Sequence, residues 1–212
     1  MKGLIIKEFL NLRKTLLYIL GFIALYGVIF ASSDGLNMGM MMAVIMAGML
    51  TITSFSYDDL AKWPKYALSL PITRKDLVKS KYLFAGLMIL LGVVAALLVG
   101  IATEIFLRDT PDFSSMWGTL YGSVIGAAVY VGVLLPLVFQ FGAEKSRYLI
   151  LAGVFVPVAV FTLASRLLGG FSLSLPSRET IKLLLYLSPA LLVLFVGISY
   201  WLSIRIFSKK EL

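Results

Sequence analysis

The 212-residue sequence contains no cysteine and no histidine. Their absence removes the thiol nucleophile, the most common general base and the usual ligands of transition metals, and it excludes intramembrane proteases of the Ser/His and metal types. No phosphate-binding loop of the form G-x-x-x-x-G-K-[ST] occurs, so the chain does not itself hydrolyse ATP by that mechanism. We therefore expect no enzyme, no catalytic residue, no metal and no cofactor in this chain. An aspartyl protease is also disfavoured because the aspartates lie between the apolar stretches, at Asp34, Asp58, Asp59, Asp76, Asp109 and Asp112.

Charge is scarce: 14% of the residues are charged and 60% are hydrophobic. A soluble core of this size could not hide so much apolar surface. Alternating strands of about ten residues, typical of an outer-membrane barrel, do not occur. The sequence predicts an all-α integral membrane protein that forms a single domain over residues 1–212. Six uncharged stretches reach or approach the roughly 20 residues that span a bilayer, and we expect six transmembrane helices in Thr15–Ser33, Gly35–Tyr57, Tyr82–Thr103, Phe113–Ala143, Tyr148–Ser165 and Leu183–Ile204.

The distribution of lysine and arginine predicts the orientation. If the N-terminus is cytoplasmic, 15 of the 19 basic residues fall on the inner side. The positive-inside rule therefore places both termini in the cytoplasm of a plasma-membrane protein. This asymmetry and the attraction of basic residues to anionic membrane lipid account for the net charge of +8, so we expect no nucleic acid as a partner.

Residues 1–14 show an amphipathic pattern. Ile5, Ile6 and Phe9 gather on one side of a helical wheel, with Lys7 and Glu8 on the other. We expect an interfacial helix along the inner leaflet that bends into the first span near Thr15. The alternative is a simple cytoplasmic extension of that span.

Three glycines recur at intervals of four in the fourth span, at Gly118, Gly122 and Gly126. Such a doubled G-x-x-x-G pattern lets another helix approach closely, and we interpret it as a helix-packing stripe. The alternative is that glycine is merely frequent in membrane helices. The neighbouring helix could belong to the same chain or to a second copy.

Residues 57–79 interrupt the apolar pattern. Asp58 and Asp59 precede a short amphipathic helix that contains Trp63 and is interrupted by Pro64. Thr73 and Asp76 then form a capping box that starts the helix leading into the third span. The segment is predicted to be a rigid cytoplasmic lever joined to a membrane helix. A basic loop that obeys the positive-inside rule would explain the lysines, but not the paired acids, Trp63 or the cap.

The run YDDLAKWPKYALSLPITRKDLVKSKYL, Tyr57 to Leu83, resembles the signature of small ABC-2 type exporter permeases of the Gram-positive type. In that family an acid pair precedes an aromatic helix, a Leu-Pro-Ile/Val-Ser/Thr-Arg turn and a Val-x-x-Lys-Tyr start of the third span. The resemblance implies a pair of permease subunits, identical copies or sister proteins. Two separate cytoplasmic ABC ATPase subunits, which bind ATP and magnesium, would lie beneath them.

On this resemblance, residues 57–79 form the coupling segment that docks in a groove of the ATPase. Trp63 and Tyr66 are its expected packing anchors. Asp58, Asp59, Lys62 and Lys65 are its expected polar contacts, and a second contact is expected from Glu144, Lys145 and Arg147. Phe171 to Lys182 are expected to match the outer re-entrant or amphipathic element of the family.

These observations favour an ATP-driven exporter permease. Within the family, the expected cargo is an amphipathic or hydrophobic peptide, such as a peptide toxin or an antimicrobial peptide. The alternative is a membrane scaffold or immunity protein that binds a partner without transport.

Overall fold

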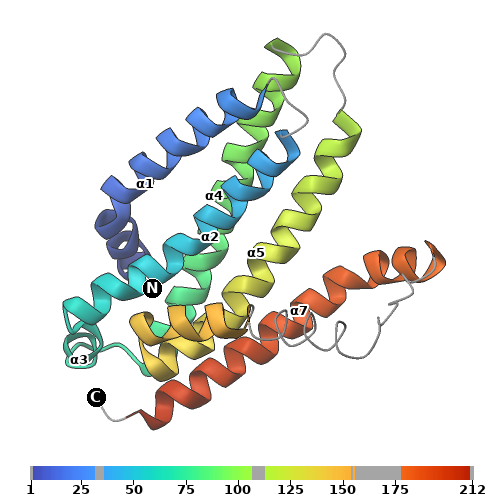
Figure 1. The fold of residues 1–212 in the computed structure, drawn as a ribbon. Coiled ribbons are helices and arrows are strands. Elements are labelled where there is room, and N and C mark those ends of the chain that lie inside the picture. The colour runs from blue at the N-terminus through green and yellow to red at the C-terminus, as the bar shows by residue number, and fades with distance from the viewer. Residues whose placement is uncertain (1, 32–35, 107–112, 154, 156–177, 211–212) are drawn as a thin grey trace.

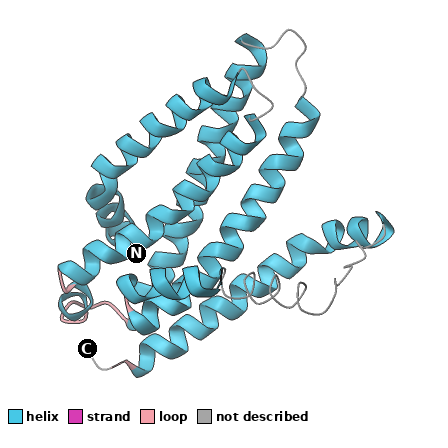
Figure 2. Ribbon diagram, in the orientation of Figure 1, coloured by secondary structure: helices cyan, strands magenta, loops and turns pink. Residues whose placement is uncertain are grey.

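The computed structural model describes residues 2–31, 36–106, 113–153, 155 and 178–210, and the regular elements within these ranges are helices, without a strand (Figures 1 and 2). Residues 143–153 form a helix directly after Gly142. The other helices are α1 (Lys2–Ala31), α2 (Leu36–Leu60), α3 (Trp63–Ala67), α4 (Arg74–Phe106), α5 (Phe113–Phe141) and α7 (Arg178–Lys209). The predicted all-α class is therefore confirmed for these residues.

Five helices are long and apolar enough to cross a membrane. They correspond to the first, second, third, fourth and sixth of the predicted spans. The predicted fifth span, Tyr148–Ser165, lies mostly outside the described residues, so the count of six stays a prediction. The five segments are Gly3–Tyr26, Asn37–Leu60, Arg74–Ile105, Met116–Phe141 and Leu185–Lys209.

The first helix is continuous from Lys2 to Ala31. Its first turns run at an angle to the rest in Figure 1. Residues 1–14 are predicted to form an interfacial helix that bends into the first span near Thr15, and residues 2–14 form the first part of α1. Their position along the inner leaflet stays a prediction.

α2 lies at the centre of the bundle and packs against α1, α4 and α5, while α7 packs against α4 and α5. Figure 1 shows that the N-terminus, α3 and the C-terminus gather at one end of the molecule, which we call the α3 end. The last turns of α4 and the first turns of α5 lie at the other end. Elements far apart in the sequence therefore meet where the candidate site lies.

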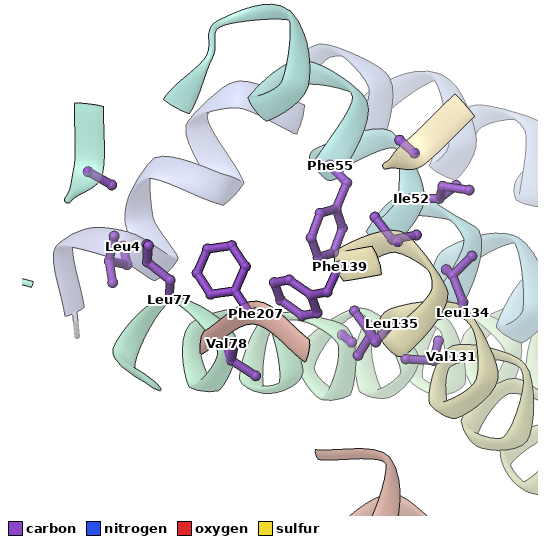
Figure 3. Packing of buried hydrophobic residues seen from close by; sticks show 14 residues of the cluster. Leu4, Ile52, Phe55, Leu77, Val78, Val131, Leu134, Leu135, Phe139 and Phe207 are labelled. Carbon is purple, nitrogen blue, oxygen red and sulfur yellow. The ribbon is translucent and has the colours of Figure 1, made fainter. Parts of the chain in front are cut away.

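An apolar core closes the α3 end (Figure 3). The ring of Phe139 on α5 lies between Phe55 on α2, at 5.1 Å between centroids, and Phe207 on α7, at 5.2 Å. Leu4 on α1 and Leu77 on α4 are buried in the same cluster. Aromatic pairs of this kind add stabilisation beyond the area that they bury. This core therefore holds five helices, α1, α2, α4, α5 and α7, together at the α3 end.

Gly92, which lies outside the predicted glycine stripe, marks a close crossing of α2 and α4. A Cβ atom at Gly92 would lie 2.6 Å from Ala47 Cβ and 3.0 Å from Val44 Cα, so α2 and α4 cross too closely for any side chain there. At Gly118, Gly122 and Gly126, an added Cβ would meet nothing within 4 Å in the described residues. The stripe therefore packs against no described helix of this chain, and its packing role stays a prediction.

We predict that Gly92→Ala lowers the free energy of unfolding by about 1–3 kcal/mol, because the new methyl group overlaps the backbone of α2. Gly86→Ala on the same helix is the matched control, because a Cβ there meets nothing within 4 Å. Thermal unfolding of the purified protein in detergent measures both. Equal unfolding midpoints for the two variants would contradict the close crossing.

Candidate functional site

Four charged side chains from three helices meet inside the α3 end. Lys7 and Glu8 come from α1, Asp58 from α2 and Lys81 from α4. Lys81 Nζ lies 2.8 Å from Glu8 Oε1 and 2.5 Å from Asp58 Oδ2. Lys7 Nζ pairs with the same two carboxylates, at 3.0 Å from Glu8 Oε1. Each lysine therefore joins both acids, so the four groups form one network.

The network is buried. Glu8 is 2% exposed, Asp58 3% and Lys81 5%. Ser54 on α2 completes it, because its hydroxyl donates to Glu8 and accepts from Lys81 Nζ at 2.6 Å. Two cations balance two anions, which offsets the high cost of moving charges out of water. We call Lys7, Glu8, Ser54, Asp58 and Lys81 the charge cluster.

Aromatic rings cover both lysines of the charge cluster. Lys81 Nζ lies 4.5 Å from the ring centroid of Phe55, and Lys7 Nζ lies 4.4 Å from that of Trp63. Both distances fall in the range of attractive cation–π contacts. Because Trp63 is the first residue of α3, this contact extends the charge cluster to the α3 segment.

Asp58 and Asp59 lie at the C-terminal end of α2, which explains why this helix needs nearby cations such as Lys7 and Lys81. α2 ends at Leu60 with both acids in its last turn and no basic residue there. The C-terminal end of a helix carries partial negative charge and disfavours anions. Lys7 and Lys81 neutralise Asp58, while Asp59 Oδ2 accepts the backbone N–H of Ala143 at 3.0 Å. Asp59 thereby caps the helix that starts after Gly142, whose φ of 84° suits glycine.

A tight turn sets the direction of α3. Lys62 has a φ of 48°, in the left-handed region that often ends a helix. Pro64 then lies in the first turn of α3, where its missing N–H costs nothing. The sequence analysis predicted that Pro64 interrupts a helix, and the structure shows α3 starting one residue before it. The result is a five-residue helix that projects from the end of α2.

The capping box at the start of α4 is confirmed. Thr73 N–H donates to Asp76 Oδ2 at 3.2 Å, and Asp76 N–H donates to Thr73 Oγ1 at 3.2 Å. The Thr73 hydroxyl also donates to the Asp76 carboxylate, at 2.6 Å. The α3 segment is therefore followed by a fixed first turn of α4, and Lys81 lies two turns further along that helix.

Basic side chains also cap two helices at this end. Arg74 Nη1 donates to the carbonyl oxygens of Phe207 at 2.8 Å and Lys210 at 2.7 Å, and Lys210 Nζ donates to Phe139 O at 3.0 Å. These carbonyls belong to the last turns of α7 and α5 or directly follow them, where cations are favourable. Arg74 thereby joins the start of α4 to the end of α7, and Lys210 joins the end of α7 to the end of α5.

The predicted coupling residues divide into two sets. Asp58 is buried in the charge cluster, whereas Trp63 is half-buried and covers Lys7. The docking roles expected of both residues stay predictions. Tyr66 is 59% exposed. Arg147 is exposed and donates to Ser56 Oγ at 3.1 Å. Asp59 is also exposed, although one of its oxygens caps the helix at Ala143. The remaining exposed members are Lys62, Lys65, Glu144 and Lys145.

A partly enclosed cavity of about 210 Å³ adjoins the charge cluster. Glu8, Asp58 and Lys81 form part of its polar wall, and Trp63 with Pro64 forms the side next to α3. Its apolar floor is the aromatic core of Phe55, Phe139 and Phe207. Free volume therefore lies next to the joint between α3 and the long helices.

No sequence pattern indicated that Lys7, Glu8, Ser54 and Lys81 belong to a site. The position of Lys81 in the sequence could have indicated a buried ion pair, because this lysine immediately precedes the uncharged stretch that starts at Tyr82. A lysine that is buried needs a partner. The identity of that partner depends on the tertiary fold.

The five spanning helices and the charged α3 end define a multi-pass membrane protein. The profile of one protein family, described as ABC-2 family transporter protein, matches residues 3–208. The chain therefore belongs to this family of transporter permeases. The family is the membrane component, not the ATPase, and implies partnership with an ABC ATPase. Comparison with curated proteins gave no match.

We predict that Lys81→Met lowers the free energy of unfolding by about 3–5 kcal/mol, because it leaves two buried carboxylates with one lysine. Lys79→Met is the control, because Lys79 is exposed on the same helix. Thermal unfolding in detergent micelles compares them. Equal stability of both variants would show that the cluster is not the buried network described.

Proposed function

We propose that the chain is the permease subunit of an ATP-binding-cassette exporter, powered by a separate ATPase. The observation that supports this most directly, beyond family membership, is the α3 segment. It is a short helix with an exposed aromatic and basic surface. It follows α2, and its Trp63 ring covers Lys7 of the charge cluster, which joins α1, α2 and α4. Such an element receives a partner on one side and contacts the membrane helices on the other.

The proposed docking surface consists of the exposed residues around α3 and the start of the helix at Ala143. Tyr66 is its aromatic anchor, because exposed tyrosines are enriched at interface hot spots. Asp59 links the two parts through its bond to Ala143 N–H. Asp58 and Trp63 act behind this surface by fixing α3 on the charge cluster. The other surface residues are Lys62, Lys65, Glu144, Lys145 and Arg147.

In this proposal the α3 end faces the cytoplasm, which agrees with the positive-inside rule. Two permease subunits, identical or sister proteins, assemble with two ATPase subunits that bind ATP and magnesium. Closure of the ATPases displaces α3, and the long helices then open alternately to the two sides of the membrane. The proposed cargo is an amphipathic or hydrophobic peptide, expelled from the cell.

We predict that Tyr66→Ala weakens ATPase binding by about 2 kcal/mol, roughly 30-fold in Kd, as for a central aromatic anchor. The matched control is Tyr186→Ala, because Tyr186 is exposed near the start of α7, away from α3. Co-purification and titration of the permease in nanodiscs with its candidate ATPase measure the effect.

ATP hydrolysis by the complex, with and without amphipathic peptides, tests transport function in the same preparation. If the wild-type chain binds no ABC ATPase, the protein is instead a membrane scaffold. If Tyr66→Ala and Tyr186→Ala bind equally well, the docking surface lies elsewhere.

A further inference from the structure

We infer that the charge cluster is a rigid joint that makes the α3-end parts of α1, α2 and α4 move as one unit when α3 is displaced. Lys7, Glu8 and Lys81 are then positioning residues for energy coupling, although they do not touch the ATPase. This inference rests on the proposed function, because it concerns how movement of the docked α3 enters the membrane.

Ion pairs connect α1, α2 and α4 directly. Lys81 on α4 binds Glu8 on α1 and Asp58 on α2, and Lys7 on α1 binds Asp58 as well. Every pair among the three helices is therefore joined by at least one ion pair. Charge-assisted bonds have narrow distance requirements and are stronger where water is excluded. Apolar contacts between helices allow sliding, whereas this buried network fixes their register.

The charge cluster lies between α3 and the apolar core of the long helices. Lys7 lies against the Trp63 ring, and Asp58 lies five residues before Trp63 in the chain. On the other side, the apolar core packs Leu4 of α1 with Leu77 of α4. A displacement of Trp63 therefore acts first on Lys7, which lies against its ring, and on Asp58, which is close to it in the chain. The cavity of about 210 Å³ beside Trp63 and Lys81 leaves room for that displacement.

The energetics of buried ion pairs also favour a positioning role for the charge cluster. A balanced buried ion pair is often no more stabilising than apolar side chains of similar volume, and replacing the whole pair is frequently tolerated. Stability alone therefore gives little reason for two lysines and two acids at this depth. Fixing the relative positions of three helices does give such a reason.

The experiment uses the absence of cysteine from the chain, because introduced cysteines can carry spin labels without background. Labels at Ile6 on α1 and Leu83 on α4, both exposed, report the distance across the joint. A label pair at Ile6 and Trp117 reports movement of the joint relative to the opposite end of α5. Distances are measured in nanodiscs with the ATPase bound, without nucleotide and with a non-hydrolysable ATP analogue.

In the wild-type complex, we expect the Ile6–Leu83 distance to stay constant while the Ile6–Trp117 distance shifts on nucleotide binding. The double variant Glu8→Gln with Lys81→Met removes one charge of each sign. It should still bind the ATPase, but the Ile6–Leu83 distance should no longer stay constant, and its distribution should broaden or shift. The control variant Glu179→Gln with Lys79→Met makes the same chemical changes at exposed positions and should behave like the wild type.

A nucleotide-dependent Ile6–Leu83 distance in the wild type would overturn the inference. An unchanged distance distribution in a folded Glu8→Gln, Lys81→Met variant would also overturn it. The wild-type measurement decides even where the double variant does not fold. A failure of the ATPase to bind the wild-type chain would instead refute the proposed function, and binding is measured separately.

Discussion

The pairing of Lys7 and Lys81 with Glu8 and Asp58 is the interaction on which the α3 end depends. It allows α2 to end in two aspartates, against the preference of a helix C-terminus for cations. It also allows α1 to bury a glutamate at 2% exposure in an apolar bundle. Without the two lysines, these acids would have to reach water, and α1 could not pack where it does.

The same end shows that the basic residues which orient a membrane protein can also hold it together. Arg74 binds carbonyl oxygens at the end of α7, and Lys210 binds a carbonyl oxygen near the end of α5. Lys7 and Lys81 bind the acids. A positive-inside excess would require only that these residues lie in the cytoplasmic region. Their contacts show that several also satisfy polar groups where helices end, so replacing them would affect packing as well as orientation.

Local features could be predicted from the sequence, and features that depend on tertiary structure could not. The capping box at Thr73 and five of the spans follow from short-range chemistry and hydrophobicity. The charge cluster joins residues as far apart as positions 7 and 81, so no spacing pattern reveals it. The glycines illustrate the same difference. Periodicity drew attention to Gly118, whereas the close crossing occurs at Gly92, an isolated glycine that only its position opposite Ala47 makes essential.

Burial of Asp58 changes the chemistry expected of the docking partner. The sequence alone suggested a surface on which two aspartates balance Lys62 and Lys65. In the structure Asp58 is internal, and one oxygen of Asp59 is taken by Ala143 N–H. The exposed surface is therefore more basic than the sequence suggests and includes Tyr66, which is exposed. Since complementary potentials guide association, an ATPase groove that receives α3 as proposed should be lined by acidic side chains around an apolar site for the tyrosine.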